Sequence, residues 1–458
     1  MSGEEGDEAR PWVVLAPGVG REALSMGRPP ESVARALAAL TAEGAREETL
    51  EALALEGGVE AAAWWQVLLR QLTLTGAVHH VARGPEGEWA RLESTRPVSP
   101  WVPLEPEPAR PLRLSRFAYL RREGPALVLE SPQVPARLVL APRALPLVAL
   151  LAEPLAFDAL AAQLPPGARP GARATWTLLA RTGLAVEAEA DGTTPEERDP
   201  RLAPWEFHDL LFHARTRHRW REQPLGGTYR FEGVLPPPPV LKPSGGPRLA
   251  LPRPDLERLR REDPPLAEVM ERRRSCRQFG REPPTRAQLG ELLYRCVRLR
   301  ALVPGERQML SSRPHPSGGA LYALELYAAV HACQDLEPGL YRYEPGEHAL
   351  ERLGGPGRAL ERLLAVPWGG AGTPPILLTL AARFPRVTWK YQSIAYAVIL
   401  KEAGVVLQSL SLGATALGLG ACPLGFGDAE AFERAAGTDG LLESSVAELA
   451  IGALPPGG

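Results

Sequence analysis

The sequence predicts an α+β protein in which two small helix-rich units precede one larger domain of mixed helices and strands. Three observations support this prediction. The chain has 458 residues, which is too long for one ordinary hydrophobic core. Apolar residues make up 45% and charged residues 23%, as in most globular proteins. The N-terminal half repeats a pattern of three short helices, whereas the C-terminal half mixes helices with strands.

We expect two winged-helix-like units, over residues 1–105 and 106–200. Helical spacing of apolar residues predicts helices over 33–40, 50–55, 61–74, 147–151, 157–164 and 172–181. In each unit a Thr-Gly pair, Thr75-Gly76 or Thr182-Gly183, predicts the end of the third helix before a strand. Three short helices that close on a hairpin are typical of a winged helix, which binds DNA or peptide, mediates dimerisation or is purely structural.

The charge distribution argues against nucleic acid as the partner. Residues 1–200 contain 20 arginines against 27 acidic residues, a net charge of −7. Affinity for nucleic acid depends mainly on neutralising phosphates, which an acidic surface opposes. Peptide docking and a structural role remain open for this half. The rest of the chain has 32 basic and 27 acidic residues, so it suits an anionic cofactor better.

Residues 201–255 are expected to form a helix followed by a domain linker. The helix, over 205–220, carries His208, His213 and His218 five residues apart. Metal ligands on one helical face need a spacing of three or four, so no metal site is expected. The prolines of 236–239 exclude helix and central strand and predict a stiff, extended linker.

Residues 256–458 are expected to form the larger α+β domain. An amphipathic helix is predicted over 286–298, and strands are predicted over 323–333, 339–343, 376–383 and 445–451. A long apolar helix from 391 to 417 should cross the centre of the domain. Lys401 and Glu402 interrupt it, and no apolar run reaches the ~18–20 residues of a membrane span.

Two features of composition bear on location and chemistry. The four cysteines, Cys276, Cys296, Cys333 and Cys422, show no paired spacing, so reduced thiols in a cytoplasmic protein are expected rather than disulfides or a zinc site. Only three of the 52 basic residues are lysines: Lys242, Lys390 and Lys401. General genome bias toward arginine explains the rarity, and each remaining lysine still calls for an explanation.

Three segments of the larger domain could bind a cofactor. Residues 272–277, Arg-Arg-Arg-Ser-Cys-Arg, combine guanidinium groups with a hydroxyl and suit a phosphate monoester, although a solvated arginine-rich face is the simpler alternative. Residues 313–320, Arg-Pro-His-Pro-Ser-Gly-Gly-Ala, bring backbone N–H groups close to a planar ligand. Residues 418–428 are rich in glycine but follow a helix, which excludes a dinucleotide-binding fingerprint.

Taken in order, these segments resemble the FMN-dependent nitroreductase superfamily. Residues 316–322, 338–343 and 390–396 are similar to its SagB-type azoline dehydrogenase branch, which makes thiazoles and oxazoles in ribosomal peptide natural products. Residues 117–131, 205–213 and 422–452 are similar to the two-part cyanobactin-type oxidases. The resemblance implies a nitroreductase-like α/β/α sandwich with a central helix over residues 256–458. It also implies a homodimer with FMN at the interface.

The resemblance also implies roles for individual residues. Arg273, Ser275 and Arg277 would hold the FMN phosphate and the pyrimidine edge. Pro316, Ser317, Gly318 and Gly319 would line the isoalloxazine from the partner subunit, and the backbone at Leu424 and Gly425 would face flavin N5 and O4. Lys390 and Tyr391 match the catalytic Lys-Tyr pair of the branch. Two departures are His315, at a position expected to be aromatic, and a C-terminus without the basic pair of many relatives, which leaves Arg434 as a further phosphate candidate.

The chemistry of the reaction explains the Lys-Tyr pair. Aromatising a thiazoline removes a proton from one ring carbon and a hydride from its neighbour, and the hydride goes to FMN. Lysine or tyrosine can accept the proton, whereas arginine stays protonated. Lys390 near the start of a helix would otherwise be an electrostatically unfavourable surface residue. Either Lys390 or Tyr391 could be the base.

We therefore expect an FMN-dependent dehydrogenase that oxidises thiazoline or oxazoline rings in a precursor peptide, with oxygen as the acceptor. The winged-helix half would position the peptide or support dimerisation, and a cyclodehydratase is the expected partner. One alternative is an NAD(P)H-dependent nitro or quinone reductase, which would leave the N-terminal half without a role. The other is a flavin-free scaffold that binds peptide within a cyclodehydratase complex. No metal, nucleic acid or membrane is expected.

Overall fold

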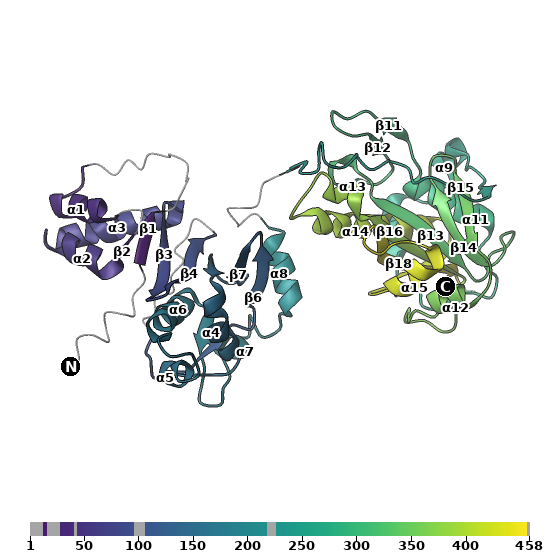
Figure 1. Cartoon of the computed structure of the whole chain (residues 1–458). Coiled ribbons are helices and arrows are strands. Elements are labelled where there is room, and N and C mark those ends of the chain that lie inside the picture. The colour runs from purple at the N-terminus through teal and green to yellow at the C-terminus, as the bar shows by residue number, and fades with distance from the viewer. Residues whose placement is uncertain (1–11, 16–27, 41–43, 96–105, 218–225, 456–458) are drawn as a thin grey trace. The chain divides into compact units, whose positions relative to one another are not determined.

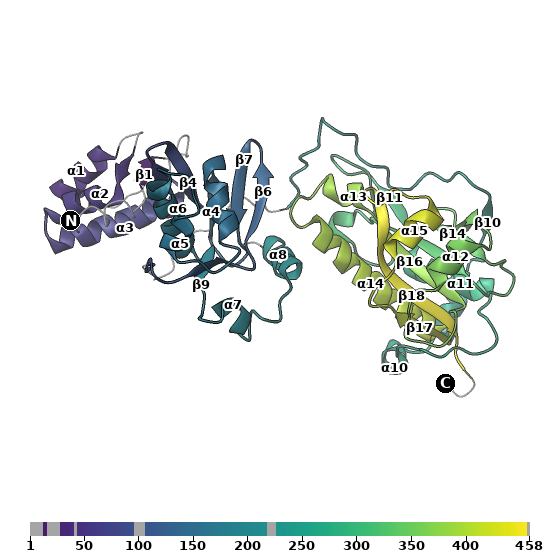
Figure 2. The same ribbon diagram turned by 60° about the horizontal axis from the view of Figure 1, so that its bottom comes forward.

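The computed structural model describes residues 12–15, 28–40, 44–95, 106–217 and 226–455. The chain divides into two compact units, unit 1 over Met1–Gln223 and unit 2 over Pro224–Gly458. Figures 1 and 2 show the elements of each unit. Helices and strands are both abundant, and the predicted α+β class is confirmed.

Unit 1 is built on one antiparallel sheet with the strand order β2-β1-β3-β4-β8-β7-β6. The strands of unit 1 are β1 (Trp12–Leu15), β2 (Ala45–Arg46), β3 (Val78–Gly84), β4 (Gly87–Ser94), β5 (Leu112–Leu114), β6 (Tyr119–Glu123), β7 (Ala126–Glu130), β8 (Ala136–Leu140) and β9 (Ala185–Glu187). Its helices are α1 (Glu31–Ala39), α2 (Glu47–Leu55), α3 (Val59–Thr75), α4 (Leu145–Leu150), α5 (Phe157–Ala161), α6 (Arg169–Thr182), α7 (Pro195–Arg198) and α8 (Phe207–Arg215).

The two expected helix ends of unit 1 are confirmed. Gly76 ends α3 with φ 71°, and Gly183 ends α6 with φ 77°. Both values lie in the left-handed region, which glycine adopts without the steric cost that a Cβ imposes. Ala77 N–H donates to the Leu72 carbonyl at 2.8 Å, which satisfies one of the last carbonyls of α3.

The two expected N-terminal units share a sheet but keep separate cores. β4 pairs with β8 from Ala90↔Leu140 to Ser94↔Ala136, so hydrogen bonds cross the expected boundary at residue 105. One core packs α1, α2 and α3 around Trp65, and the other packs α4, α5 and α6 around Trp176. The sheet therefore joins the two helical groups into one unit, an arrangement that helical periodicity did not predict. The winged-helix assignment stays a prediction.

Unit 2 is a sandwich with helices on both faces of a seven-stranded antiparallel sheet, in the order β10-β15-β14-β13-β16-β18-β17. Its strands are β10 (Arg248–Ala250), β11 (Ala301–Val303), β12 (Leu310–Ser312), β13 (Leu324–Val330), β14 (Gly339–Glu344), β15 (Ala349–Gly354), β16 (Ile376–Arg383), β17 (Leu419–Pro423) and β18 (Glu443–Ala453). Its helices are α9 (Leu256–Glu262), α10 (Leu266–Arg272), α11 (Arg286–Val297), α12 (Arg358–Leu364), α13 (Phe384–Thr388), α14 (Ala395–Ala416) and α15 (Ala429–Ala436).

The central helix of the sandwich is α14. It packs with α11 on one face of the sheet, whereas α12 and α15 pack on the other, so the predicted layers are confirmed. In Figures 1 and 2, α14 lies along β17 and β18. Among the described residues, only this helix is long and apolar enough to cross a membrane. Its packing on the sheet and its buried Glu402 instead fit the core helix of a folded domain.

α14 begins at Ala395, four residues later than expected. The short helix α13 ends at Thr388, and Lys390 and Tyr391 lie in the connection between the two helices. Their backbone N–H groups both donate to the Val387 carbonyl, at 3.1 and 2.8 Å. The two residues are therefore held by a turn and not by the helix. The expected helix over 205–220 is shorter as well, since α8 ends at Arg215, and Trp220 lies outside the described residues.

The proline run, expected as a linker, packs on unit 2. Residues 235–247, which we call the proline strap, offer carbonyl groups to side chains of the sandwich. Arg386 donates to the Pro238 carbonyl at 2.8 Å, Arg383 donates to the Pro239 carbonyl at 2.8 Å, and the Trp389 indole donates to the Leu235 carbonyl at 3.0 Å. Proline lacks an N–H but keeps its carbonyl, so an extended proline run can accept such bonds along its length.

Lys242 fastens the strap to the sheet. Its ammonium group donates to a Glu443 carboxylate oxygen at 2.5 Å and to the Tyr327 hydroxyl at 2.9 Å, and that hydroxyl donates to the other Glu443 oxygen at 2.5 Å. Burial and the Glu443 carboxylate raise the pKa of Tyr327, so the hydroxyl keeps its proton. One of the three lysines thus has a structural role.

Candidate functional site

The candidate site is centred on the turn formed by Pro316, Ser317, Gly318 and Gly319. The Ser317 hydroxyl donates to Glu402 of α14 at 2.7 Å and accepts from the Tyr322 N–H at 3.0 Å. A Cβ at Gly318 would lie 2.3 Å from the Val398 side chain, so the turn packs directly on α14. These contacts fix the turn against the central helix, and glycine at position 318 allows the close approach.

The backbone of this turn is strained. Gly319 has φ 65°, and two residues with side chains, Ala320 and Tyr322, have φ 57° and 47°. The left-handed conformation costs roughly 1–3 kcal/mol for such residues, and strain of this kind clusters at functional sites. The turn is therefore held in shape by its surroundings, of which the Ser317–Glu402 hydrogen bond is one part.

Lys390 and Tyr391 both point at Gly319. A Cβ built on Gly319 would lie 2.5 Å from the Tyr391 hydroxyl oxygen and 2.7 Å from the Lys390 Nζ. The ammonium nitrogen also lies 5.3 Å from the centre of the Tyr391 ring. Two groups that can accept or donate a proton thus meet over one residue that has no side chain. The structure brings the predicted Lys-Tyr pair together with the predicted glycine turn, which is 71 residues earlier in the chain.

Arg386 holds the Lys390 loop against the turn. Its guanidinium group is fully buried and donates to the Leu321 carbonyl at 2.9 Å and to the Pro238 carbonyl at 2.8 Å. Burial, with repulsion from Arg383 and Arg313, lowers the pKa of Arg386 to about 10. Arg386 therefore ties α13, the end of the glycine turn and the proline strap together. Sequence reasoning missed it, because nothing local distinguishes it from the chain's other arginines.

His315 and Glu402 form the buried support of the turn. His315 Nδ1 lies 3.0 Å from the Cys296 carbonyl, Nε2 lies 3.8 Å from Glu402, and the ring packs edge-on against Tyr322 with 5.3 Å between centroids. A histidine thus takes the place of the expected aromatic residue while keeping an aromatic contact. Sequence reasoning noted Glu402 only as a charge in a helix. Its burial makes it part of the site.

The second group of predicted residues lies along β17. Ser275 forms a parallel bridge with Ala421, and Cys276 N–H donates to the Ala421 carbonyl at 2.9 Å. Arg273 is half-buried and Arg277 is exposed. Arg272 pairs with Glu268 at 3.0 Å, whereas no carboxylate among the described residues forms an ion pair with Arg273 or Arg277. Two arginines that flank a serine in the sequence suit a phosphate monoester.

Leu424 and Gly425 follow β17 directly. The Leu424 N–H donates to the Glu448 carbonyl at 3.0 Å, so this N–H is engaged within the protein. A Cβ on Gly425 would meet nothing within 4 Å, so there is open space above its α-carbon. That space fits a planar ring that approaches the backbone closely. Burial raises the pKa of the nearby Glu448 carboxyl.

The glycine turn and the segment of residues 272–276 lie at opposite ends of α14. Gly318 packs on Val398 near the start of this helix. A hollow of about 350 Å³ near its end is lined by Thr415 and by Arg272, Arg274 and Cys276, which alternate with the predicted phosphate ligands along the chain. The 17 residues between these contacts correspond to about 25 Å of helix. The structure brings Lys390, Tyr391 and the glycine turn together, and brings Ser275 to β17, but the described contacts do not join the two groups within one chain.

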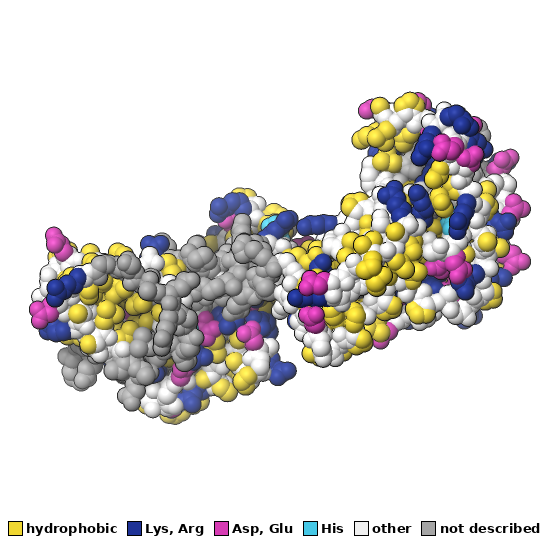
Figure 3. Space-filling model, turned by 90° about the horizontal axis from the view of Figure 1, so that it is seen from above, with side chains coloured by type: hydrophobic (Ala, Val, Ile, Leu, Met, Phe, Trp, Pro, Cys, Tyr) yellow, Lys and Arg dark blue, Asp and Glu magenta, His cyan; other side chains and the backbone are white. Residues whose placement is uncertain are grey.

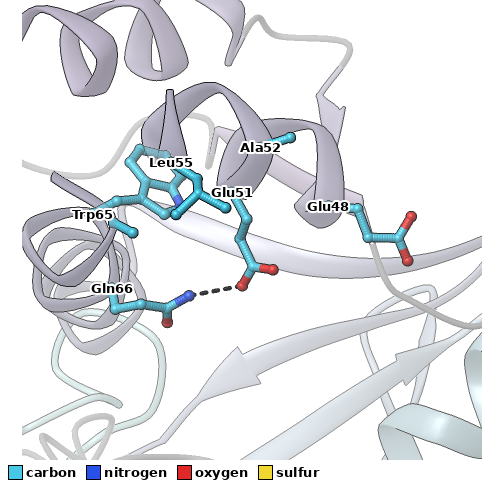
Figure 4. A pocket seen from close by; sticks show the side chains of 7 residues that line it. Glu48, Glu51, Ala52, Leu55, Trp65 and Gln66 are labelled. Carbon is cyan, nitrogen blue, oxygen red and sulfur yellow. Dashed lines mark hydrogen bonds between the residues drawn. The ribbon is translucent and has the colours of Figure 1, made fainter. Parts of the chain in front are cut away.

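The larger hollow of about 540 Å³ lies in unit 1, between α2 and α3. Glu48 and Glu51 of α2 and Trp65 and Gln66 of α3 line it, and Gln66 donates to Glu51 at 2.7 Å (Figure 4). Among the described residues, its lining contains no lysine or arginine, so the hollow does not suit the phosphate of a nucleotide cofactor. Exposed Leu55 adjoins the two glutamates.

Two family models match the chain. Residues 112–222 match the model described as cyanobactin oxidase ThcOx, and residues 270–453 match the nitroreductase family. A provisionally named nitroreductase of Methanocaldococcus jannaschii is 32% identical over 163 residues, which cover 35% of this chain and 76% of that protein. The cyanobactin oxidase match lies in unit 1, and the nitroreductase match lies in unit 2.

Solved structures are also similar to the chain. One is the Escherichia coli microcin synthetase McbBCD complex with truncated pro-MccB17 bound, at 20% identity and TM-score 0.35, covering 51% of this chain and 83% of that chain. Another is a Desulfovibrio desulfuricans nitroreductase, provisionally so named, in complex with FMN, at 18% identity and TM-score 0.27, covering 41% of this chain and 86% of that one.

Proposed function

The chain belongs to the nitroreductase family and carries a cyanobactin oxidase domain ahead of its nitroreductase domain, and on this basis we propose that it oxidises azoline rings in a ribosomally made precursor peptide. It is an oxidoreductase. The observation that carries the proposal is the meeting of the Lys390 amine and the Tyr391 hydroxyl over Gly319. An azoline ring above that glycine would have a proton acceptor at hand on one side.

The residues of this chain fit FMN as the cofactor. Arg273, Ser275 and Arg277 would hold its phosphate, and the open space above Gly425 would admit the edge of its ring system. When bound, FMN supplies the acceptor for the hydride that leaves the ring. Lys390 or Tyr391 takes the proton from the neighbouring ring carbon, and the rigid turn at Gly319 keeps both groups aimed at that position.

We propose that the active form is a homodimer with a cofactor at each interface. α14 has an exposed face on which Tyr396, Leu400 and Val405 are 46%, 37% and 36% exposed, together with exposed Lys401 and Gln408. Figure 3 shows hydrophobic side chains on the surface of the described chain. If the α14 helices of two copies pack antiparallel on this face, the Gly319 turn of one copy lies near the Arg273 group of the other. This symmetry would complete the site that a single chain leaves divided.

We propose that unit 1 docks the precursor peptide and that a cyclodehydratase supplies the azoline rings. The cyanobactin oxidase match over residues 112–222 of unit 1 supports this division. The cysteines of unit 2 are all free, and Cys276, Cys296 and Cys422 are buried, which supports the proposed cytoplasmic location.

The absorption spectrum of the full-length protein as isolated, followed by turnover of a thiazoline peptide, tests the proposal. A flavin absorption spectrum whose chromophore passes into the supernatant when acid precipitates the protein, and conversion of thiazoline to thiazole with oxygen consumption, are expected. Lys390→Ala should lose the conversion while keeping the flavin. A colourless protein, or a flavoprotein that reduces nitro compounds with NAD(P)H but leaves the thiazoline unchanged, would contradict it.

A further inference from the structure

The segment Gly226–Leu235, which leads into the proline strap, lies on the Lys390 loop. The backbone N–H groups of Thr228 and Tyr229 both donate to the Lys390 carbonyl, at 2.8 and 3.2 Å. The Trp389 indole donates to the Leu235 carbonyl at the far end of the segment. The segment is thus bonded to the two residues that precede Tyr391, although it is about 160 residues away in the sequence.

The Tyr229 ring faces the Lys390 side chain. The Lys390 Nζ lies 5.8 Å from the ring centre, and the ring packs edge-on against Trp389 with 5.7 Å between centroids and 81° between planes. The Arg307 guanidinium group lies 4.4 Å from the same ring and pairs with Glu232 at 3.3 Å. Aromatic rings attract cations that lie within about 6 Å of their centres. Tyr229 is therefore held in place by two neighbours, Trp389 and Arg307, and directed at a third, Lys390.

The local backbone shows the cost of this placement. Tyr229 has φ 49°, an unfavourable value for a residue with a large side chain. A Cβ on Gly227 would lie 2.8 Å from the Tyr229 ring and 3.2 Å from the Lys390 side chain, so any side chain at position 227 would displace the Tyr229 ring. A strained tyrosine beside a close-packed glycine indicates that the surrounding contacts determine where the ring lies.

We propose that Tyr229 is a positioning residue of the site: its ring, on a segment outside the matched nitroreductase domain, holds the Lys390 amine over Gly319. The catalytic part of this inference rests on the proposed function. The ring limits the rotamers of the long Lys390 side chain before the substrate binds. Less side-chain entropy is then lost when the substrate binds. Proton transfer at the Lys390 amine then depends on a residue that local sequence does not connect with it.

Competitive acetylation of lysines with a limiting amount of acetic anhydride tests the placement without any turnover. The chain has only three lysines, so each can be quantified by mass spectrometry of the full-length protein after digestion. A lysine-containing reference peptide added to the reaction serves as the standard, because Lys401 adjoins Leu400 on the α14 face that the proposed dimer covers. In Tyr229→Leu, acetylation of Lys390 relative to this peptide should rise about threefold, because the ring no longer holds the amine in place. Tyr229→Phe, which keeps the ring, should match the wild type.

Kinetics of thiazoline oxidation test the positioning role. Tyr229→Leu should lower kcat about tenfold with little change in KM, and Phe231→Leu, two residues away on the same segment, is the control that should change neither. Equal acetylation of Lys390 in wild type and Tyr229→Leu would overturn the proposal, as would increased acetylation with unchanged kcat. If the wild type oxidises no azoline, the proposed function fails, and the acetylation ratio alone decides whether Tyr229 positions Lys390.

Discussion

The Ser317 hydroxyl donates a 2.7 Å hydrogen bond to Glu402, a carboxylate that is 3% exposed at the centre of α14. The same hydroxyl accepts from the Tyr322 N–H. The resemblance to nitroreductases implies contact between Ser317 and the flavin, which stays a prediction. The structure shows that the side chain is already engaged in holding the glycine turn on the central helix.

Ser317→Ala should therefore destabilise unit 2. The variant removes one partner from a buried carboxylate and one from a backbone N–H, and such losses cost roughly 1–3 kcal/mol each. Chemical denaturation followed by circular dichroism measures the change. Ser409→Ala is the control, because its hydroxyl bonds only locally, to the Val405 carbonyl on the same helix. Weaker FMN binding with unchanged stability would show that Ser317 acts mainly on the cofactor.

Gly319→Ala should abolish most of the activity. The added methyl group would lie 2.5 Å from the Tyr391 hydroxyl and 2.7 Å from the Lys390 amine, and the residue has φ 65°. Both groups would have to move, and small displacements of reacting groups can cost about 100-fold in rate. Gly354→Ala, at a position with nothing within 4 Å of the new Cβ, is the matched control. Equal thiazoline turnover in the two variants would contradict this geometry.

Removing either Arg273 or Arg277 should weaken FMN binding. A hydrogen bond to a charged group contributes about 1.5–3 kcal/mol, so each alanine variant should raise the Kd about 10- to 100-fold. Fluorescence quenching of added FMN by the flavin-stripped protein measures this. Arg434→Ala is the comparison, because Arg434 pairs with Glu430 at 2.7 Å on α15. A larger increase in Kd for Arg434→Ala would indicate that Arg434, and not Arg273 or Arg277, binds the phosphate.

Leu400→Glu should dissociate the proposed dimer. Leu400 is 37% exposed on the outer face of α14, and a buried carboxylate without a partner strongly disfavours association. Leu353→Glu is the control, since Leu353 is equally exposed but lies on β15. Sedimentation analysis should show a dimer for the wild type and Leu353→Glu and a monomer with little FMN for Leu400→Glu. A monomeric, flavin-loaded wild type would exclude the interface.

Unit 1 should lose stability as the pH falls below about 6.5. Burial, with repulsion from Arg181, lowers the pKa of His80 from 6.5 to about 3, so the unfolded chain binds a proton that the folded chain does not. The contribution of His80 to the free energy of unfolding is therefore constant above pH 6.5. Between pH 6.5 and 3 it decreases by about 1.4 kcal/mol per pH unit.

Thermal unfolding of the full chain between pH 7.5 and 4.5 measures this dependence on pH. His80→Leu should flatten the decrease in Tm for the transition of unit 1, whereas exposed His213→Gln should leave the slope unchanged. An identical slope in wild type and His80→Leu would show that other groups are responsible.

Features that depend on neighbouring residues were predictable from the sequence. Gly76 and Gly183 end their helices as expected, and the strand over 376–383 was predicted with the bounds it has in the structure. The alternation of apolar residues and the steric freedom of glycine depend only on residues a few positions apart, so both can be recognised in the sequence. The rarity of lysine and the Pro-Ser-Gly-Gly segment likewise indicate Lys390 and Gly319 as candidate residues from the sequence alone.

The sequence by itself therefore determined the fold class, most of the elements and the candidate residues, because each depends on local pattern or on resemblance. Only the tertiary structure decided how they meet. It joined β4 to β8 across the expected boundary, laid the proline strap on unit 2, turned Ser317 toward Glu402 and placed Tyr229 against Lys390. Each of these contacts joins residues about 40 to 160 positions apart. No local periodicity records which distant partner satisfies a buried hydroxyl, a carbonyl or an ammonium group.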